Sequence, residues 1–272
     1  EEGDWAEITP SSVTIHDESG EVAKRQVQLT ASTGAATGKG DFPHFMLKEI
    51  FEQPGVIGDT LYSLVNPQTR TIELPDIPFA WDGVPKVTLV ACGTSSYAAL
   101  VAKYWFEDIA GIAVEWDIAS EFRYRAPHLP QGGVALFISQ SGETADTLAA
   151  LRFAREQGQH IVALVNVPES SIAREADLVL GTHAGPEIGV ASTKAFTTQL
   201  TVLACLVIAA ARAREAIGHE REAALSAALM EVPARVADVL NHDEKLRVIA
   251  KNVAKARDVI YLGRGASFPI AL

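Results

Sequence analysis

The chain has 272 residues, 48% of them hydrophobic, which is enough material for a sizeable core in one or two domains. Its formal net charge of -11 is not offset by any basic block, so nucleic acid and anionic membranes are not expected as partners. The two cysteines, Cys92 and Cys205, lie in apolar segments and are interpreted as buried, reduced thiols. The histidines lack metal-ligand spacing, and the longest apolar run, 200–211, is too short to span a bilayer. No signal peptide, metal or other cofactor is predicted.

The N-terminal part of the sequence predicts small elements before a larger domain. Residues 1–30 alternate polar and apolar side chains and predict a small β element. Residues 32–41 are rich in Gly, Ala and Thr and are interpreted as a linker. Two helices are then expected, over 44–52 and 56–65, with the break at Pro54.

From residue 86 onward, short apolar runs alternate with helical patterns. Strands are predicted at 87–91, 113–116, 134–138, 160–165 and 177–180. Helices are predicted at 97–110, 145–157, 170–175, 196–216, 220–240 and 243–256. This alternation favours the α/β class, with a doubly wound, mostly parallel sheet flanked by helices. Residues 259–267 repeat the pattern of 88–95, so the start of a second, similar domain is expected there.

The hydroxyl-rich turn that follows strand 134–138 is the first candidate site. Ser139, Ser141 and Thr144 offer hydroxyl groups, Gly142 permits close backbone approach, and a helix begins directly afterwards. The first N–H groups of a helix are unpaired and carry partial positive charge, which suits a phosphate. The alternative is ordinary helix capping by Ser141 and Thr144, with Glu143 favouring the helix dipole.

A second turn of the same kind, 92–96, follows strand 87–91. If the two strands are neighbours, Ser95 and the 139–144 turn, including Gln140, converge on one ligand at the carboxyl edge of the sheet. The sequence has no Walker lysine and no G-x-G-x-x-G fingerprint, which disfavours NTPases and dinucleotide enzymes. Many neutral donors without a lysine are typical of a site for a sugar phosphate.

The loop 185–194 could supply further contacts to the sugar through Val190, Ala191 and Ser192. Helix capping by Ser192 or Thr193 is the alternative interpretation of this loop. Lys194 either contacts the substrate or, as most such lysines do, is solvated.

Two other residues of the turns are weaker candidates for a role in catalysis. Glu143 could act as an acid or base, but a single carboxylate at a helix start is more often a dipole partner. Cys92 is a weak candidate for a nucleophile, because no histidine lies nearby in the sequence to activate it.

Four long motifs occur together in this order along the chain. They are ACGTS at 91–95, ASEFRYR at 119–125, SQSGETADT at 139–147 and EIGVASTKAFT at 187–197. With these motifs the chain resembles the isomerising glutamine:fructose-6-phosphate aminotransferases, the glucosamine-6-phosphate synthases, and carries a sugar-isomerase (SIS) domain. HFMLKEIFEQP at 44–54 resembles the interdomain segment of that family, and residues 1–29 resemble the end of its glutaminase domain.

The resemblance implies a cytoplasmic homodimer that passes ammonia from glutamine to fructose-6-phosphate and yields glucosamine-6-phosphate. It implies phosphate contacts at Ser95, Ser139, Gln140, Ser141 and Thr144, and sugar contacts near Thr94, Val190, Ala191 and Ser192. The predicted substrate-binding set is Gly93, Thr94, Ser95, Ser139, Gln140, Ser141, Thr144, Val190, Ala191 and Ser192.

The resemblance also suggests how the chain divides. The expected parts are a glutaminase tail (1–32), a linker with a helical lead-in (33–85), a first SIS domain (86–217), connecting helices (218–257) and the start of a second SIS domain (258–272).

The family's catalytic groups are expected outside this sequence. Its cysteine nucleophile would precede Glu1, and its isomerase glutamate, ring-opening histidine and Schiff-base lysine would follow Leu272. The chain is therefore expected to bind the sugar phosphate and to be inactive alone. A phosphosugar-sensing SIS module without chemistry is the alternative, and a nucleotide-binding Rossmann domain is a third, less favoured interpretation.

Overall fold

The computed structural model describes residues 3–25 and 38–272, which fall into two compact units divided after residue 36. In the first unit, β1 (Trp5–Ile8) and β2 (Val13–His16) pair antiparallel, and the rings of Trp5 and His16 stack with centroids 4.2 Å apart. This confirms a small N-terminal β element. Residues 26–30 of that element and most of the predicted linker, 32–37, lie outside the described residues.

The second unit is built on a five-stranded parallel sheet with the order β6-β5-β7-β8-β9. The strands are β5 (Val87–Ala91), β6 (Val114–Ile118), β7 (Val134–Ser139), β8 (His160–Val165) and β9 (Leu178–Gly181). The predicted parallel, doubly wound sheet is confirmed. The central strands read as continuous apolar runs because helices cover both of their faces.

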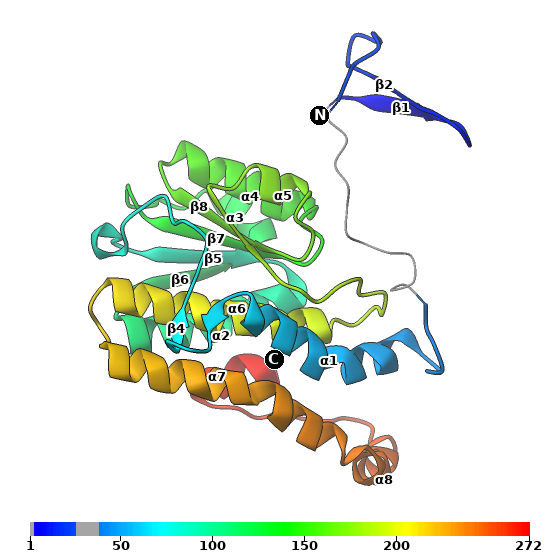
Figure 1. Cartoon of the computed structure of the whole chain (residues 1–272), viewed down its shortest axis with the longest axis vertical. Helices are drawn as coiled ribbons and strands as arrows, with labels where there is room; N and C mark the ends of the chain where they lie inside the picture. Colours follow the sequence, from blue (N-terminus) through cyan, green and yellow to red (C-terminus); the bar gives the residue numbers. More distant parts are fainter. Residues whose placement is uncertain (1–2, 26–37) are drawn as a thin grey trace. The chain divides into compact units, whose positions relative to one another are not determined.

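Alternate residues of β5, β7, β8 and β9 enter two separate cores. In β7, Leu136 and Ile138 join the core on one side of the sheet, whereas Ala135 and Phe137 join the core on the other side. Figure 1 shows the corresponding layers: one set of helices lies above the sheet and another below it. Above lie α3 (Ala119–Arg125), α4 (Ala145–Glu156) and α5 (Ser171–Arg174); below lie α1 (Phe45–Tyr62), α2 (Gly93–Trp105), α6 (Lys194–Ala213) and α7 (His219–Leu240).

The predicted break at Pro54 is wrong, because α1 is one helix of 18 residues with Pro54 inside it. A proline in a helix leaves the carbonyl four residues earlier without its N–H donor. Here that carbonyl belongs to Ile50, and the side-chain amide of Gln53 donates to it at 3.0 Å. The neighbouring glutamine therefore restores the hydrogen bond that the proline removes.

The helix predicted at 97–110 begins earlier, so residues 93–96 of the expected turn are already helical. Gly93 opens α2 with a positive φ of 56°, a conformation that glycine adopts without strain. The last residues, Phe106–Ala110, form a π-helical turn that ends at Gly111. The candidate residues Gly93, Thr94 and Ser95 therefore occupy the first turn of a helix.

The helix α6 is long and apolar enough to cross a membrane by length and composition, yet 78% of its apolar window is buried inside the fold. It packs between α1 and α2 and contributes side chains to the larger core. Such burial is typical of the central helix of a globular core, as the sequence predicted for the run 200–211.

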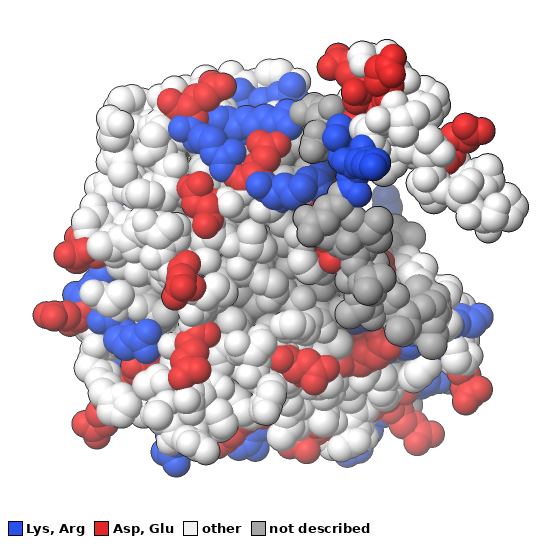
Figure 2. All heavy atoms as spheres, turned by 45° about the horizontal axis from the view of Figure 1, so that its top comes forward, with Lys and Arg blue, Asp and Glu red and all other residues white. Residues whose placement is uncertain are grey.

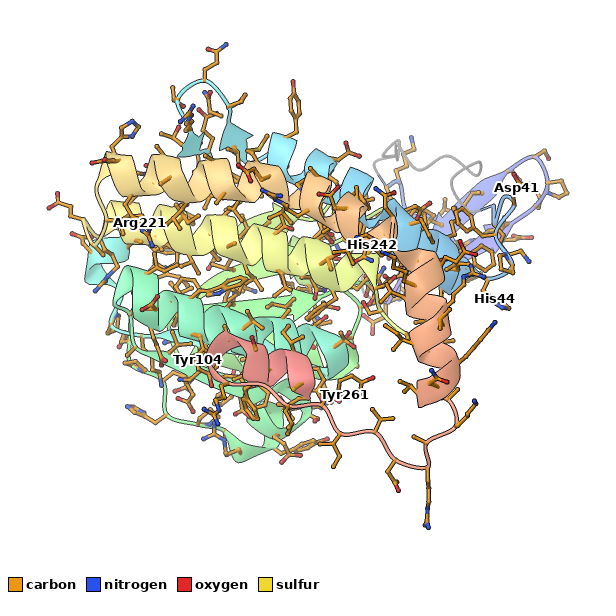
Figure 3. The ribbon with its side chains drawn as sticks, turned by 90° about the horizontal axis from the view of Figure 1, so that it is seen from below. Asp41, His44, Tyr104, Arg221, His242 and Tyr261 are labelled. Carbon is orange, nitrogen blue, oxygen red and sulfur yellow. The ribbon has the colours of Figure 1, made fainter. Side chains whose placement is uncertain are left out.

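The C-terminal part of the chain packs less closely on the sheet. Figure 3 shows α7 lying along α6, followed by α8 (Asp243–Val253) and an irregular segment that leads past Tyr261 to the short helix α9 (Phe268–Ala271). In the described structure the apolar run 259–262 belongs to no strand, and its four side chains are 50–91% exposed. A strand needs a partner to satisfy its backbone, and this run has none among the described residues.

Candidate functional site

The two hydroxyl-rich turns lie side by side because their strands are neighbours. β5 pairs with β7 in parallel, with Ala91 opposite Ile138 at the carboxyl ends of the two strands. The chain runs outward from β5 to β6 and then returns across β5 to β7, so the strand order reverses at this point. Open α/β sheets bind their ligands at such a topological switch point, outside the carboxyl ends of the strands.

The turn after β7 is held together by its own hydroxyl groups. The Oγ of Ser139 accepts a hydrogen bond from the N–H of Gly142 at 3.0 Å and lies 3.0 Å from the Oγ1 of Thr144. The Oγ of Ser141 accepts from the N–H of Glu143 at 3.2 Å. Ser139 is buried whereas Ser141 is exposed. The buried Ser139 therefore anchors the turn, and Ser141 is presented to solvent.

Gly142 is required at the centre of this turn for two reasons. Its φ is +67°, in the left-handed region where a side chain is strained. A Cβ at this position would also lie 1.9 Å from the Oγ of Ser170 and 2.3 Å from its Cβ. The turn can therefore pack against the start of α5 only because residue 142 has no side chain.

The capping alternative for this turn is not what the structure contains. Thr144 is the N-cap residue of α4 and makes no side-chain capping hydrogen bond. The carboxylate of Glu143 instead accepts from the N–H of Ser171 at 2.7 Å, at the start of α5. Glu143 thus caps the start of a neighbouring helix rather than that of α4, whose first turn has no side-chain cap from Thr144.

The turn after β5 is joined to α6 by a side-chain hydrogen bond. The Nε2 of Gln199 donates to the Oγ of Ser95 at 3.0 Å, although 104 residues separate them. Gln199 is buried, and its Oε1 has no hydrogen-bond partner among the described residues. The amide therefore fixes the orientation of the Ser95 hydroxyl. No pattern in the sequence singles out Gln199, because it lies within an apolar helix.

The loop that carries Val190, Ala191 and Ser192 is stabilised by carboxylates rather than by hydroxyl capping. The carboxylate of Glu187 accepts from the N–H groups of Thr193 and Ala195 at 2.9 and 3.0 Å and from the Oγ of Ser192 at 3.0 Å. Thr193 is the N-cap of α6 without a side-chain capping bond, so the capping interpretation of Ser192 and Thr193 is wrong. Val190 points fully into solvent, with a relative exposure of 107%.

Lys194 is not solvated, which corrects the sequence-based expectation. Its side chain is only 4% exposed, and its Nζ lies 2.7 Å from the Oε2 of Glu52 on α1. Burial by itself raises the pKa of the Glu52 carboxyl, but the hydrogen bonds and charges of Lys194 and Lys48 outweigh it and hold that pKa below its usual range. The lysine therefore ties α6 to α1 as one half of an ion pair.

Asn166 joins the turn after β7 to the loop after β9. Its N–H donates to the carbonyl of Gln140 at 3.1 Å, and its Nδ2 donates to the carbonyl of Gly185 at 2.8 Å. The Oδ1 accepts from the Oγ1 of Thr182 at 2.8 Å. A polar residue directly after strand 160–165 was the signal in the sequence that could have identified it. Through Asn166 and Gln199, all three candidate segments are connected at one edge of the sheet.

The described residues offer hydroxyl, amide and backbone N–H donors at this edge, and several basic side chains elsewhere on the surface pair with acidic ones. Figure 2 shows basic and acidic side chains next to one another on the face that carries α4 and α5. The pairs there include Arg123 with Asp146 at 3.3 Å and Arg155 with Glu175 at 3.7 Å. Within 3–25 and 38–272, no cluster of three or more His, Cys, Asp or Glu side chains is arranged to hold a metal.

The two cysteines occupy different environments. Cys92 is the half-buried N-cap of α2, and Cys205 lies in the core on α6. Burial raises the pKa of the Cys205 thiol to about 12, so it stays protonated at neutral pH. Both are free thiols in the structure.

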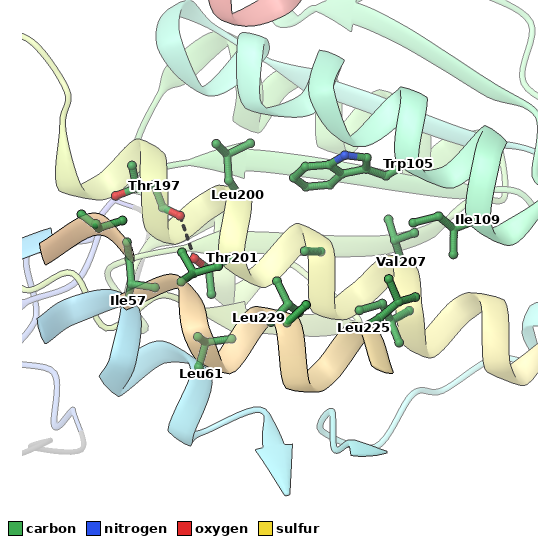
Figure 4. A pocket seen from close by; sticks show the side chains of 15 residues that line it. Ile57, Leu61, Trp105, Ile109, Thr197, Leu200, Thr201, Val207, Leu225 and Leu229 are labelled. Carbon is green, nitrogen blue, oxygen red and sulfur yellow. Dashed lines mark hydrogen bonds between the residues drawn. The ribbon is translucent and has the colours of Figure 1, made fainter. Parts of the chain in front are cut away.

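A separate apolar hollow of about 430 Å³ lies between α1, α2, α6 and α7. Its walls include Leu61, Trp105, Leu200 and Leu229, and Figure 4 shows these side chains together with the hydrogen bond from the Oγ1 of Thr201. None of the ten candidate residues lines it. The hollow therefore does not form part of the hydroxyl-lined site.

Comparison with known proteins first defines the class. The sequence family described as SIS domain matches residues 84–209, which contain all ten candidate site residues. The C-terminal domain of glucosamine-fructose-6-phosphate aminotransferase from Francisella tularensis has a similar structure, with a TM-score of 0.82 and 38% identity over 86% of this chain and 66% of that chain. The protein therefore has a SIS fold.

Sequence relatives then give a more specific similarity. The chain is 52% identical over its whole length to a protein from Bradyrhizobium diazoefficiens and 50% identical to one from Zymomonas mobilis. Both are named glutamine–fructose-6-phosphate aminotransferase [isomerizing]. The chain is similar to both relatives over its whole length, and it spans 45% of the length of each of them.

Proposed function

We propose that this chain is the sugar-phosphate-binding part of an enzyme that makes glucosamine-6-phosphate from fructose-6-phosphate and glutamine. The observation that carries the proposal is the pairing of β5 with β7, which brings two hydroxyl-rich turns to the switch point of the sheet. The relatives are named for fructose-6-phosphate and glutamine, which supports this substrate class.

In the proposed complex, the phosphate lies against the first turns of α2 and α4. The hydroxyl groups of Ser95, Ser139, Ser141 and Thr144 and the amide of Gln140 surround it, and the helix N–H groups favour its negative charge. Gly93 allows the backbone to approach closely, and Thr94 lies between the phosphate and the sugar. Val190, Ala191 and Ser192 contact the sugar from the loop before α6.

The chain itself is proposed to bind and orient the sugar without carrying out the chemical steps. Glu143 is engaged with the N–H of Ser171, which supports a structural role for it. The cytoplasmic location and the homodimer belong to the same proposal.

The test is calorimetric titration of the chain with glucosamine-6-phosphate, with glucosamine, inorganic phosphate and NAD as controls. Saturable binding of the phosphosugar but not of glucosamine is expected. Because a hydrogen bond to a charged group contributes about 1.5–3 kcal/mol, Ser141→Ala should weaken this binding roughly 10- to 150-fold. Binding of NAD instead, or phosphosugar binding that Ser141→Ala leaves unchanged, would contradict the proposal.

A further inference from the structure

The backbone of the loop 187–193 is held by a carboxylate from a distant part of the chain. The Oε1 of Glu49, on the first turns of α1, accepts from the N–H of Ile188 at 2.6 Å and from the N–H of Gly189 at 3.1 Å. Its Oε2 lies 3.2 Å from the same Gly189 nitrogen. Glu49 and Ile188 are separated by 139 positions in the sequence.

The position of Glu49 makes this interaction costly to replace. Its relative exposure is 2%, so water is not available to solvate the carboxylate if the loop moves away. The loop is fitted closely around it: a Cβ on Gly189 would lie 2.5 Å from the Oε2 of Glu49 and 3.3 Å from the Cα of Met46. The carboxylate and the glycine therefore define one position of the loop relative to α1.

The residue that follows this contact is Val190, which points into solvent at the edge that carries the candidate site. The turn 139–144 is stabilised by its own hydroxyl groups, and in the described part of the chain the contacts of Glu49 go to Ile188 and Gly189 instead. Glu49 can therefore influence the two halves of the site differently: it sets the place of the 190–192 segment and leaves the phosphate donors unchanged.

We infer that Glu49 is a positioning residue for sugar recognition, which acts through the backbone N–H groups of Ile188 and Gly189 to hold Val190–Ser192 over the sugar. This inference rests on the proposed sugar-phosphate function and deepens it by assigning the sugar side of the site to a contact made by α1. The ion pair of Lys194 with Glu52, at 2.7 Å, holds the start of α6 against the same helix. Both ends of the loop are therefore attached to α1.

The experiment compares two ligands on the whole 272-residue chain. Glu49→Gln retains the shape of the side chain but removes its charge. It also replaces one carboxylate oxygen, an acceptor, by an NH₂ group, a donor that cannot accept from the backbone N–H groups it faces. It should weaken glucosamine-6-phosphate binding about tenfold or more and change inorganic phosphate binding less than about twofold. Gly189→Ala, which displaces the carboxylate from the loop side, should show the same selective loss. Asp59→Asn, the same change of charge at an exposed position of α1, should affect neither ligand.

The outcomes separate this inference from the proposed function. If the unsubstituted chain binds the phosphosugar and both variants bind it equally well, or lose both ligands in parallel, the positioning role is overturned while the proposed function stands. If the unsubstituted chain does not bind the phosphosugar, the proposed function and the positioning role both fail. If Glu49→Gln does not fold, Gly189→Ala tests the inference in the same way, by the loss of glucosamine-6-phosphate affinity relative to the loss of inorganic phosphate affinity.

Discussion

The two halves of the candidate site are built in opposite ways. In the turn 139–144, the hydroxyl hydrogen bonds join residues two to five positions apart. In the loop 187–193, the contacts from α1 join residues 139–142 positions apart, through Glu49 and through the pair of Glu52 with Lys194. The hydroxyl hydrogen bonds of the first half are therefore local, whereas the second half combines local contacts of Glu187 with contacts that need α1 packed against α6. A substitution in one half should therefore change stability and ligand binding differently from a substitution in the other half.

The largest effect is expected from Gly142→Ala, which tests how tightly the local turn is packed. The left-handed backbone costs a non-glycine residue about 1–2 kcal/mol, and the overlap with Ser170 adds about 1–3 kcal/mol. The free energy of unfolding in urea should therefore fall by roughly 2–5 kcal/mol.

Gly111→Ala provides the control for Gly142→Ala. Gly111 has a similar φ of +61°, but no atom lies within 4 Å of its Cβ position. It should show the backbone cost alone. Equal losses in the two variants would mean that the contact of the turn with Ser170 is not a close one.

The next effect is on binding, through Ser139→Ala. This change removes the acceptor of the Gly142 N–H and the partner of the Thr144 hydroxyl, and so loosens the whole turn. Titration should show glucosamine-6-phosphate and inorganic phosphate both weakened by about tenfold or more, in contrast to the selective loss in Glu49→Gln. Ser226→Ala removes a buried hydroxyl that has no partner in the described structure and should leave both affinities unchanged. Retention of phosphate binding by Ser139→Ala would remove the distinction between the two halves.

The support of the distant half can be broken at Glu52. Glu52→Gln leaves the buried ammonium of Lys194 without its charge partner, which should lower the free energy of unfolding by about 1–3 kcal/mol near neutral pH. Glu231→Gln, in an exposed pair with Arg235 on α7, should cost no more than about 0.5 kcal/mol.

The cost of Glu52→Gln should also depend on pH. The pKa of Glu52 is lower in the folded chain than its ordinary value of 4.5. The ionised carboxylate therefore stabilises the fold above 4.5, and this contribution disappears as the pH falls through the lowered folded value. The difference between the unsubstituted chain and the variant should shrink on acidification below 4.5; a difference that does not change with pH would contradict the ion pair.

The smallest effect is expected at Gln199, which joins the turn after β5 to α6. In Gln199→Leu the Ser95 hydroxyl loses the donor that orients it, and loss of a neutral hydrogen bond should weaken phosphosugar binding roughly 2- to 10-fold. Stability should be unchanged or higher, because the unpartnered Oε1 is removed from the core. Gln159→Leu, at another buried glutamine with an unpartnered Oε1, should not change binding. Equal affinity in Gln199→Leu and the unsubstituted chain would exclude an orienting role.

The sequence by itself determined the order of strands and helices and the identity of the two hydroxyl-rich turns. Continuous apolar runs are typical of strands buried on both faces, and the hydroxyl groups of Ser139 and Ser141 accept hydrogen bonds from N–H groups of the same turn, so both features can be recognised in a short window. The same local logic failed at Pro54, where a side-chain donor from Gln53 completes the helix. It failed again at Lys194, which a local pattern places in solvent and the fold buries.

Only the tertiary structure decided which turns meet and what holds the loop 187–193. β5 and β7 are neighbours because of how the chain crosses the sheet. The apolar pattern of a strand does not indicate which other strand pairs with it. The hydrogen bonds of Glu49 and Gln199 each join residues that are more than a hundred positions apart in the sequence. Such contacts form because burial removes competing water from a carboxylate or an amide, and burial depends on the whole packed core rather than on residues nearby in the sequence.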